Sequence, residues 1–127
     1  MATTKTFSKP VVSALETDKI IGIRAGKGEH RFTGVWVVVV KGRVFVRPWN
    51  AKASGWHNAL LQESVGTLQL MSGRELGMRG RGVRGERLLD AIDAAYAEKY
   101  HTPGARKWVR GFSTPGRRAN TTELVPR

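Results

Sequence analysis

Cysteine is absent from this chain of 127 residues. Its absence excludes disulfide bonds, thiolate zinc sites, cysteine-held iron–sulfur clusters and a cysteine nucleophile. We therefore expect a protein that suits a reducing compartment and is stabilised by hydrophobic burial, because a chain of this length can bury a sizeable core without crosslinks. The length predicts one domain over residues 1–127, with an N-terminal helical segment in residues 1–17.

Long apolar segments are also absent. Residues 1–18 contain no apolar core of the length that a secretory signal peptide needs. No stretch of the chain reaches the ~20 apolar residues that span a bilayer. The sequence therefore predicts a cytoplasmic protein that does not enter a membrane.

Acidic residues are few. The chain has 10 aspartates and glutamates against 22 lysines and arginines, which gives a formal net charge of +12. Such a charge attracts anionic partners, but nucleic acid, an anionic membrane surface and a phosphate-bearing cofactor all satisfy it. Gly26 and Gly28 lack the spacing of a phosphate-binding loop, and the three histidines lack the spacing of a metal site. We expect neither a metal centre nor a catalytic triad.

Hydrophobic patterning predicts a mainly antiparallel sheet. Residues 35–40 are apolar and almost all β-branched, as expected for a central strand that is covered on both faces. Lys41 and Gly42 form a two-residue hairpin signal before a partner strand. The predicted strands are 19–24, 32–40, 44–46, 67–71, 75–81 and 117–125.

One long helix is predicted beside this sheet. In residues 86–100, Leu88, Ile92 and Tyr96 recur every four positions, and acidic residues occupy the other face, toward solvent or the arginines. Shorter helices are predicted near residues 8–16 and 56–63. Six short strands with helical additions favour an α+β fold built on a small β-barrel, because closing the sheet removes its exposed edges.

The loop RPWNAKASGWHNALL, residues 47–61, follows the central hairpin and holds the candidate binding residues. Guanidinium, ammonium, hydroxyl and amide groups together match the oxygens of a phosphate, and the two tryptophans could stack on a flat aromatic ring. The alternative is a solvated turn whose tryptophans fill the barrel mouth. The candidate cofactor-binding residues are Arg47, Trp49, Asn50, Lys52, Ser54, Trp56 and Asn58.

His57 lies in the same loop and is the candidate for proton transfer. It could donate to a cofactor oxygen or shuttle a proton near neutral pH. A lone histidine is more often a hydrogen-bonded structural residue. Arg24, Lys27 and Arg31 flank the first turn and could add charge at the same end of the barrel, with a solvated face as the alternative.

A second basic segment suggests a different function. Arg79, Arg81, Arg84 and Arg87 follow one another at short intervals, and a basic barrel face could track a phosphate backbone. The segment lacks the interleaved aromatic residues that single-strand binders use. A basic edge that discourages sheet-to-sheet aggregation explains it equally well.

Three segments carry a resemblance to a known family. They are VWVVVVKGRVFVRPWNAKASGWHNALLQESVGTLQL, LLDAIDAAYAEKY and RRANTTELVPR. In this order they resemble the bacterial family called domain of unknown function 2255, over residues 20–127. More widely, a strand followed by a Gly and Ser loop and a W-x-N pattern is similar to the deazaflavin-dependent nitroreductases of the FMN-binding split-barrel superfamily.

This resemblance implies a six-stranded split β-barrel, usually a homodimer, with a flavin or deazaflavin against the barrel and its phosphate held by basic residues. It also implies a flavin- or deazaflavin-dependent oxidoreductase. The residues themselves leave FMN, deazaflavin, haem and no cofactor open. The alternative function is a non-enzymatic basic module that binds nucleic acid or a protein partner.

Overall fold

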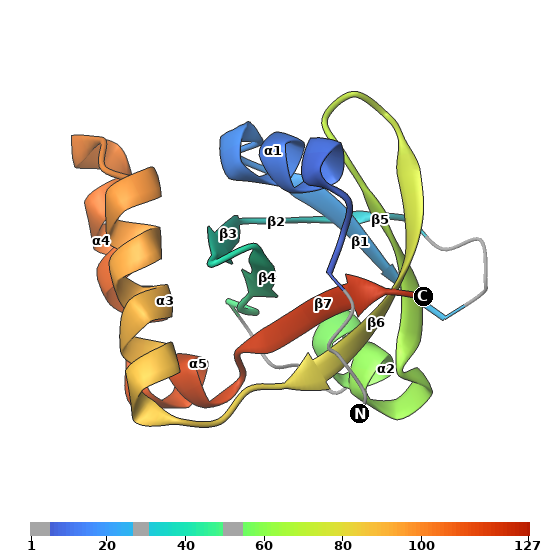
Figure 1. The fold of residues 1–127 in the computed structure, drawn as a ribbon. Coiled ribbons are helices and arrows are strands. Elements are labelled where there is room, and N and C mark those ends of the chain that lie inside the picture. Colours follow the sequence, from blue (N-terminus) through green and yellow to red (C-terminus); the bar gives the residue numbers. More distant parts are fainter. Residues whose placement is uncertain (1–5, 27–30, 50–54) are drawn as a thin grey trace.

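A single antiparallel sheet that curls into a nearly closed barrel is the centre of the structure, a computed structural model that describes residues 6–26, 31–49 and 55–127 (Figure 1). Its strand order is β2-β1-β5-β6-β7-β4-β3, and every pairing is antiparallel. The strands are β1 (Ile21–Ala25), β2 (Thr33–Val35), β3 (Val37–Val40), β4 (Arg43–Val46), β5 (Val65–Gln69), β6 (Glu75–Gly82) and β7 (Thr122–Pro126).

Barrel closure depends on the short interruption at Trp36. The sequence predicted one strand over residues 32–40, but the structure divides it into β2 and β3, so the described residues form seven strands rather than six. Strand β2 pairs with β1, and β3 pairs with β4. Because β2 and β3 are the two outer strands of the sheet order and are joined by one residue, the chain itself brings the two edges together.

The β3–β4 hairpin confirms the turn that the sequence predicted. Lys41 has φ 52° and Gly42 has φ 77°. Two successive positive φ angles are typical of a type I′ turn, whose twist matches that of the flanking strands. Val38 and Phe45 are therefore direct cross-strand partners in this hairpin.

Aliphatic side chains fill the barrel interior. Ile23, Leu68 and Met78 are fully buried there. Helix α1 (Lys9–Thr17) adds Leu15 to this core, and α2 (Trp56–Glu63) adds Leu60. A β-carbon at Gly80 would lie 2.5 Å from Leu60 Cδ2, so the missing side chain lets α2 pack closely on β6.

A second core lies outside the barrel, between the β3–β4 hairpin and three helices. These are α3 (Glu86–Lys99), α4 (Pro103–Phe112) and α5 (Pro115–Ala119). In Figure 1, α3 and α4 stand side by side next to the barrel. Val38 and Phe45 point from the hairpin into a cluster of rings that includes Tyr96, Tyr100 and Phe112. We call this region the helical flank.

Tyr100 and Lys99 join the helical flank to the rest of the structure. The Tyr100 hydroxyl accepts a hydrogen bond from Val37 N (3.0 Å) and donates to Lys19 O (2.6 Å). Lys99 Nζ donates to Leu15 O (2.8 Å) and Val37 O (2.7 Å). Burial lowers the pKa of Lys99 to about 8 and raises the pKa of Tyr100.

The bounds of the predicted helices are confirmed to within two residues. The helices that the sequence did not predict lie after residue 100. The sequence did not predict α4 or α5, and the strand predicted over 117–125 is wrong in its first part, because residues 115–119 are helical and β7 begins at Thr122. Thr102-Pro103 and Thr114-Pro115 each place an extended threonine before a proline in the first helical turn. This arrangement begins a helix. Within the described ranges, each helix is too short or too polar to cross a bilayer.

Candidate ligand-binding site

All four tryptophans of the chain line one cavity of about 480 Å³, although they lie far apart in the sequence. The cavity lies beside the β2–β3 interruption, the end of β4, the start of α2 and helix α4. We call it the tryptophan cavity. The residues that line it are Thr33, Gly34, Val35, Trp36, Arg47, Trp49, Trp56, Trp108 and Phe112.

Each tryptophan is held by a different element. Trp36 lies at the break between β2 and β3 and stacks on Tyr100, with ring centroids 4.1 Å apart and planes within 4°. Trp49 follows β4 and makes edge contacts with Trp108 of α4, at 4.9 Å. Trp56 is the first residue of α2. Trp108 is 42% exposed, so it forms the outer rim of the cavity.

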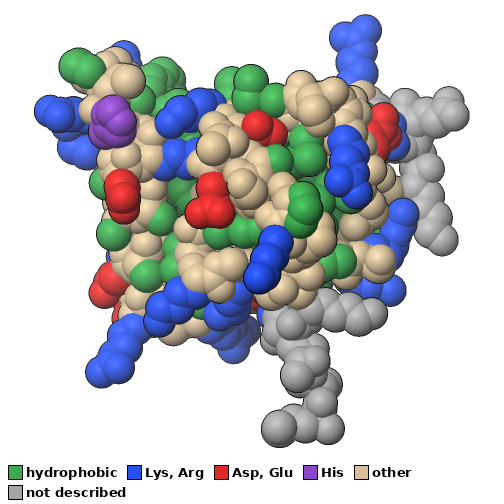
Figure 2. Space-filling model, turned by 45° about the horizontal axis from the view of Figure 1, so that its top comes forward, with side chains coloured by type: hydrophobic (Ala, Val, Ile, Leu, Met, Phe, Trp, Pro, Cys, Tyr) green, Lys and Arg blue, Asp and Glu red, His purple; other side chains and the backbone are tan. Residues whose placement is uncertain are grey.

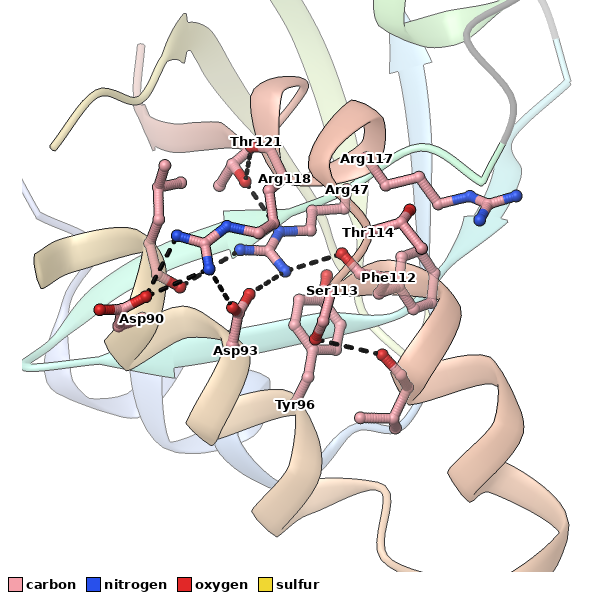
Figure 3. Close-up of polar contacts among 12 residues, drawn as sticks. Arg47, Asp90, Asp93, Tyr96, Phe112, Ser113, Thr114, Arg117, Arg118 and Thr121 are labelled. Atoms are coloured by element: carbon pink, nitrogen blue, oxygen red, sulfur yellow. Dashed lines mark hydrogen bonds and ion pairs between the residues drawn. The ribbon is translucent and has the colours of Figure 1, made fainter. Parts of the chain in front are cut away.

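Arg47 is bonded to the protein on nearly all sides. It is 1% exposed, and its Nε donates to Thr121 Oγ1 (2.7 Å) while Nη1 donates to Phe112 O (3.0 Å) and to Asp93. Figure 3 shows the guanidinium enclosed between α3 and the α4–α5 segment. The residue that the sequence analysis assigned to a phosphate therefore links β4 to the helical flank, and it contributes positive charge to the cavity wall.

The Asp93 carboxylate forms ion pairs with two arginines. Its Oδ1 faces Arg47, and its Oδ2 accepts from Arg118 Nη1 at 2.6 Å. Arg118 also donates to Asp90 (Figure 3) and to Glu86, both on α3. The hydrogen bonds that Arg118 donates to Asp90 and the charges of the three carboxylates raise the pKa of Arg118. The sequence left solvent and the arginines open as surroundings of these acids, and in the structure Glu86, Asp90 and Asp93 contact Arg118.

His57 lies on α2 and is 5% exposed. Burial disfavours the imidazolium and lowers the pKa of His57, and a hydrogen bond with the backbone of Asn120 opposes this effect only in part. Among the described residues, its Nδ1 has no hydrogen-bond partner. Burial therefore favours the neutral form of His57, and His57 is not among the residues that line the tryptophan cavity.

The other candidates of the loop are placed only in part. Asn58 lies half-buried in the first turn of α2, next to His57. Asn50, Lys52 and Ser54 lie outside the described residues, so their proposed phosphate contacts stay predictions.

A smaller cavity of about 300 Å³ adjoins the first and shares Thr33 and Trp56 with it. We call it the side cavity. Arg24 and Arg31 are among its lining residues, whereas Lys27 lies outside the described residues. The Arg24 guanidinium lies over Phe32 (4.5 Å), with Nη2 3.4 Å from Glu75 and a buried Nε that has no partner among the described residues. Arg31 is exposed and is the freer of the two cations.

The sequence analysis missed Trp36, Trp108 and Phe112 as lining residues. Trp36 interrupts a run of valines, and Trp108 is the one aromatic residue among the cations of α4 before Phe112. Both tryptophans stand out from their neighbours in the sequence. Their proximity to Trp49, however, results from barrel closure and from the two helices that the sequence did not predict. Within the described ranges, no group of three or more acidic or histidine side chains could hold a metal ion.

Comparison with known protein families shows which family the chain belongs to. Residues 12–124 match the family described as "Uncharacterized protein conserved in bacteria (DUF2255)". This protein belongs to DUF2255. The match covers β1 to β6, the first part of β7, the loop after β4 and helices α2 to α5, so the resemblance noted from the sequence is confirmed. No protein with a curated description matches this DUF2255 chain.

Solved structures show the same fold at low sequence identity. The conserved hypothetical protein Rv2991 from Mycobacterium tuberculosis has a TM-score of 0.61 and 14% identity, and the match covers 100% of this chain and 85% of that one. A candidate pyridoxamine 5'-phosphate oxidase from Listeria innocua has a TM-score of 0.61, with 9% identity and coverage of 93% and 91%. The FAD and heme binding protein from Mycobacterium smegmatis has 0.52, with 13% identity and coverage of 97% and 67%. The DUF2255 chain therefore shares its overall fold with these three proteins.

Proposed function

We propose that this protein binds a planar, anionic aromatic cofactor of the flavin type in the tryptophan cavity and acts as an oxidoreductase. The observation that carries the proposal is the convergence of all four tryptophans on one cavity. Its volume of about 480 Å³ lies within the ~300–1,000 Å³ of small-molecule sites. Flat indole walls favour a flat aromatic ligand, because stacked rings bury a large apolar area.

The charges around the cavity favour an anion. Arg47 lies in the wall, and the Arg117 guanidinium lies 3.7 Å from the ring centroid of Trp49. Among the described residues that line the tryptophan cavity, none is acidic. Asp93 partly compensates the charge of Arg47, whereas Arg117 forms no ion pair with a carboxylate among the described residues. Positive charge next to a low-dielectric wall raises the affinity for negatively charged groups.

The phosphate of such a cofactor would lie in the side cavity. Thr33 and Trp56 line both cavities, so a ligand that fills the first reaches the second directly. Arg31 is the main candidate for the phosphate, because Arg24 is already in contact with Phe32 and Glu75. Lys52 and Ser54 remain candidates for the same role from the sequence alone.

The cofactor would supply the electron-transfer chemistry, and the protein's own residues would bind and orient it. Trp36 and Trp56 would hold the ring between β2 and α2, and Trp108 would limit the access of water at the rim. His57 is buried away from the lining residues, so we do not assign it a proton-transfer role. The titles of the structural neighbours name pyridoxamine 5'-phosphate oxidase and FAD and heme binding, which supports a flavin-type ligand and keeps haem as an alternative ring.

The test is a titration of the purified protein with FMN, riboflavin, the deazaflavin coenzyme and haemin. Because all four tryptophans line the cavity, quenching of tryptophan fluorescence, corrected for the absorbance of each compound, reports on the site. We expect saturable quenching by FMN, weaker binding of riboflavin, which lacks the phosphate, and loss of binding in Trp56→Ala. Met71→Ala is the control, because Met71 is 67% exposed and does not line the cavity. Absence of quenching by all four compounds would refute the proposal.

The exposed arginines support a second candidate, a non-enzymatic module that binds nucleic acid. Arg79 and Arg81 are exposed two residues apart on β6, and Arg84 and Arg87 follow before and within α3. Arg81 is partly compensated by an ion pair with Glu123. Figure 2 shows lysines and arginines at several separate places on the face that it draws. Binding to single-stranded DNA that falls steeply with salt, while FMN fails to bind, would favour this candidate.

The homodimer also stays a prediction from the resemblance. Sedimentation equilibrium with and without FMN would give the mass of the species in solution. A dimer would agree with the prediction, and a monomer in both samples would contradict it.

A further inference from the structure

Arg117 and Arg118 are neighbours in α5, but they contact different parts of the protein. Arg118 binds the acidic face of α3, with Nη1 2.6 Å from Asp93 Oδ2 and 3.1 Å from Asp90 Oδ1. Figure 3 shows that the Arg117 side chain extends in the other direction, away from this acidic cluster. Arg117 reaches Trp49 at the tryptophan cavity instead.

The Arg117 guanidinium holds both the ring and the backbone of Trp49. Its Cζ lies 3.7 Å from the indole centroid, and its Nε donates to Trp49 O at 2.9 Å. Its Nη1 donates to Gly111 O at 3.2 Å, which ties the same contact to the last turn of α4. Within the described residues it forms no ion pair with a carboxylate, so its charge acts on the indole and on the cavity.

The absence of a side chain at Gly111 lets the Trp49 indole pack against α4. A β-carbon at this position would lie 2.4 Å from Trp49 Cη2 and 2.7 Å from Cζ3, distances that no real side chain tolerates. The indole therefore lies directly against the backbone of α4. Trp108 and Phe112 make edge contacts with the same ring, at centroid distances of 4.9 and 5.2 Å.

We infer that Arg117 is a positioning residue for Trp49: it holds the indole as a wall of the tryptophan cavity and thereby sets the affinity of the cavity for a planar anionic ligand. The part that concerns ligand affinity rests on the proposed function. The physical reason is preorganisation, because a ring whose position is already determined loses less conformational entropy when a ligand stacks on it. A planar guanidinium is suited to this role, since it stacks on an aromatic face and donates hydrogen bonds within its plane.

The first experiment uses the ligand-free protein. The indole N–H resonance of Trp49, assigned with Trp49→Phe, is compared in wild type, Arg117→Gln, Arg117→Lys and the neighbouring control Arg118→Gln. We expect both Arg117 variants to shift this resonance and increase its mobility. Arg118→Gln should lower the melting temperature and leave the resonance in place. An unchanged Trp49 resonance in a folded Arg117 variant would overturn the inference.

The second experiment measures the affinity for FMN in the same variants. We expect Arg117→Gln to weaken FMN binding by about tenfold, which corresponds to about 1.4 kcal/mol. Arg117→Lys should recover only part of it, because an ammonium keeps the charge but not the planar stacking. Arg118→Gln should bind FMN like wild type. Equal FMN affinity in wild type and both Arg117 variants would overturn the role of Arg117 in affinity.

The two experiments separate this inference from the proposed function. If wild type does not bind FMN, the proposed function fails for this ligand, while the ligand-free resonance still decides whether Arg117 positions Trp49. Gly111→Ala provides an independent variant, because its methyl group must displace the indole while Arg117 is retained. A Trp49 resonance that is unchanged in Gly111→Ala would contradict the close packing of the indole on the α4 backbone.

Discussion

The barrel interior and the helical flank differ in what fills them. Aliphatic side chains such as Leu68 and Met78 fill the interior, and their burial needs no hydrogen-bond partners. Rings fill the flank, together with the buried guanidinium of Arg47 and the hydroxyl of Tyr100. The interior is therefore a tolerant scaffold, whereas the flank depends on specific polar contacts and also forms most of the tryptophan cavity.

The largest expected effect is in the flank. Asp93→Ala removes the carboxylate between Arg47 and Arg118 and leaves the Arg47 charge buried with only neutral acceptors. Removing one partner of a buried ion pair costs about 3–5 kcal/mol in unfolding free energy. Chemical denaturation measures the loss. A loss below about 1 kcal/mol would mean that the neutral acceptors suffice and that the polar contacts of the flank are not essential.

A core truncation in the barrel should have a slightly smaller effect. Leu68→Ala removes a fully buried side chain, and such changes cost about 2–5 kcal/mol depending on how far the site collapses. The comparison is sharpened by Leu68→Met, which conserves most of the volume and should cost less than about 1.5 kcal/mol. Denaturation with urea gives both values. Equal losses in the two variants would mean that the interior requires specific shapes, contrary to the description above.

Tyr100 lies where the helical flank contacts the barrel, and its hydroxyl gives the next prediction. Tyr100→Phe removes the acceptor of the buried Val37 N–H while the ring stacked on Trp36 is retained. We expect a loss of about 1–3 kcal/mol, the cost of leaving a buried donor unsatisfied. Differential scanning calorimetry measures it. Tyr96→Phe is a matched control, because its hydroxyl donates a longer bond of 3.2 Å to Trp36 O, and a larger loss there would reverse the expected order.

The smallest expected effect is the response to mild acid. The folded-state pKa of His57 is lowered below its ordinary value of 6.5, so the unfolded chain binds the proton more readily. The stability that neutral His57 contributes is present above pH 6.5 and is lost as the pH falls through the folded pKa. Denaturation at pH 7.5, 6 and 5 should show this decline, and His57→Gln should flatten it.

Glu123 provides a second pH dependence of stability, at lower pH than that of His57, so the two contributions can be separated. Its folded-state pKa is also lowered from the ordinary 4.5, because Arg43 and Arg81 hold the carboxylate despite its burial. Stability from this group is present above pH 4.5 and is lost at lower pH. A decline between pH 7.5 and 5 that persists in His57→Gln would therefore point to a group other than these two.

The scaffold could be predicted from the sequence, and much of the site could not. The β-branched run at 35–40 and the Lys41-Gly42 turn act locally, so the hairpin and its place at the centre of the sheet followed from neighbouring residues. The cavity depends on contacts between Trp36, Trp49 and Trp108, which are distant in the sequence and meet only after closure. Local patterns contain no information on such contacts.

Arg47 shows the same limit for a single residue. Its position in a polar loop between tryptophans favoured a phosphate contact, which is a sound interpretation of an exposed arginine. Its burial is caused by Phe112, the last residue of the unpredicted helix α4, and by Thr121, which follows the unpredicted helix α5. An error in secondary structure after residue 100 thus became an error about the surroundings of a residue near position 50.

Trp36 joins the closure of the barrel to the wall of the cavity. Because the same residue separates β2 from β3 and faces the tryptophan cavity, occupancy of the cavity and folding of the whole chain are thermodynamically linked. A ligand present at one hundred times its dissociation constant would add about 2.7 kcal/mol to the free energy of unfolding. The cellular lifetime of the protein would then follow the supply of whatever ligand occupies the cavity.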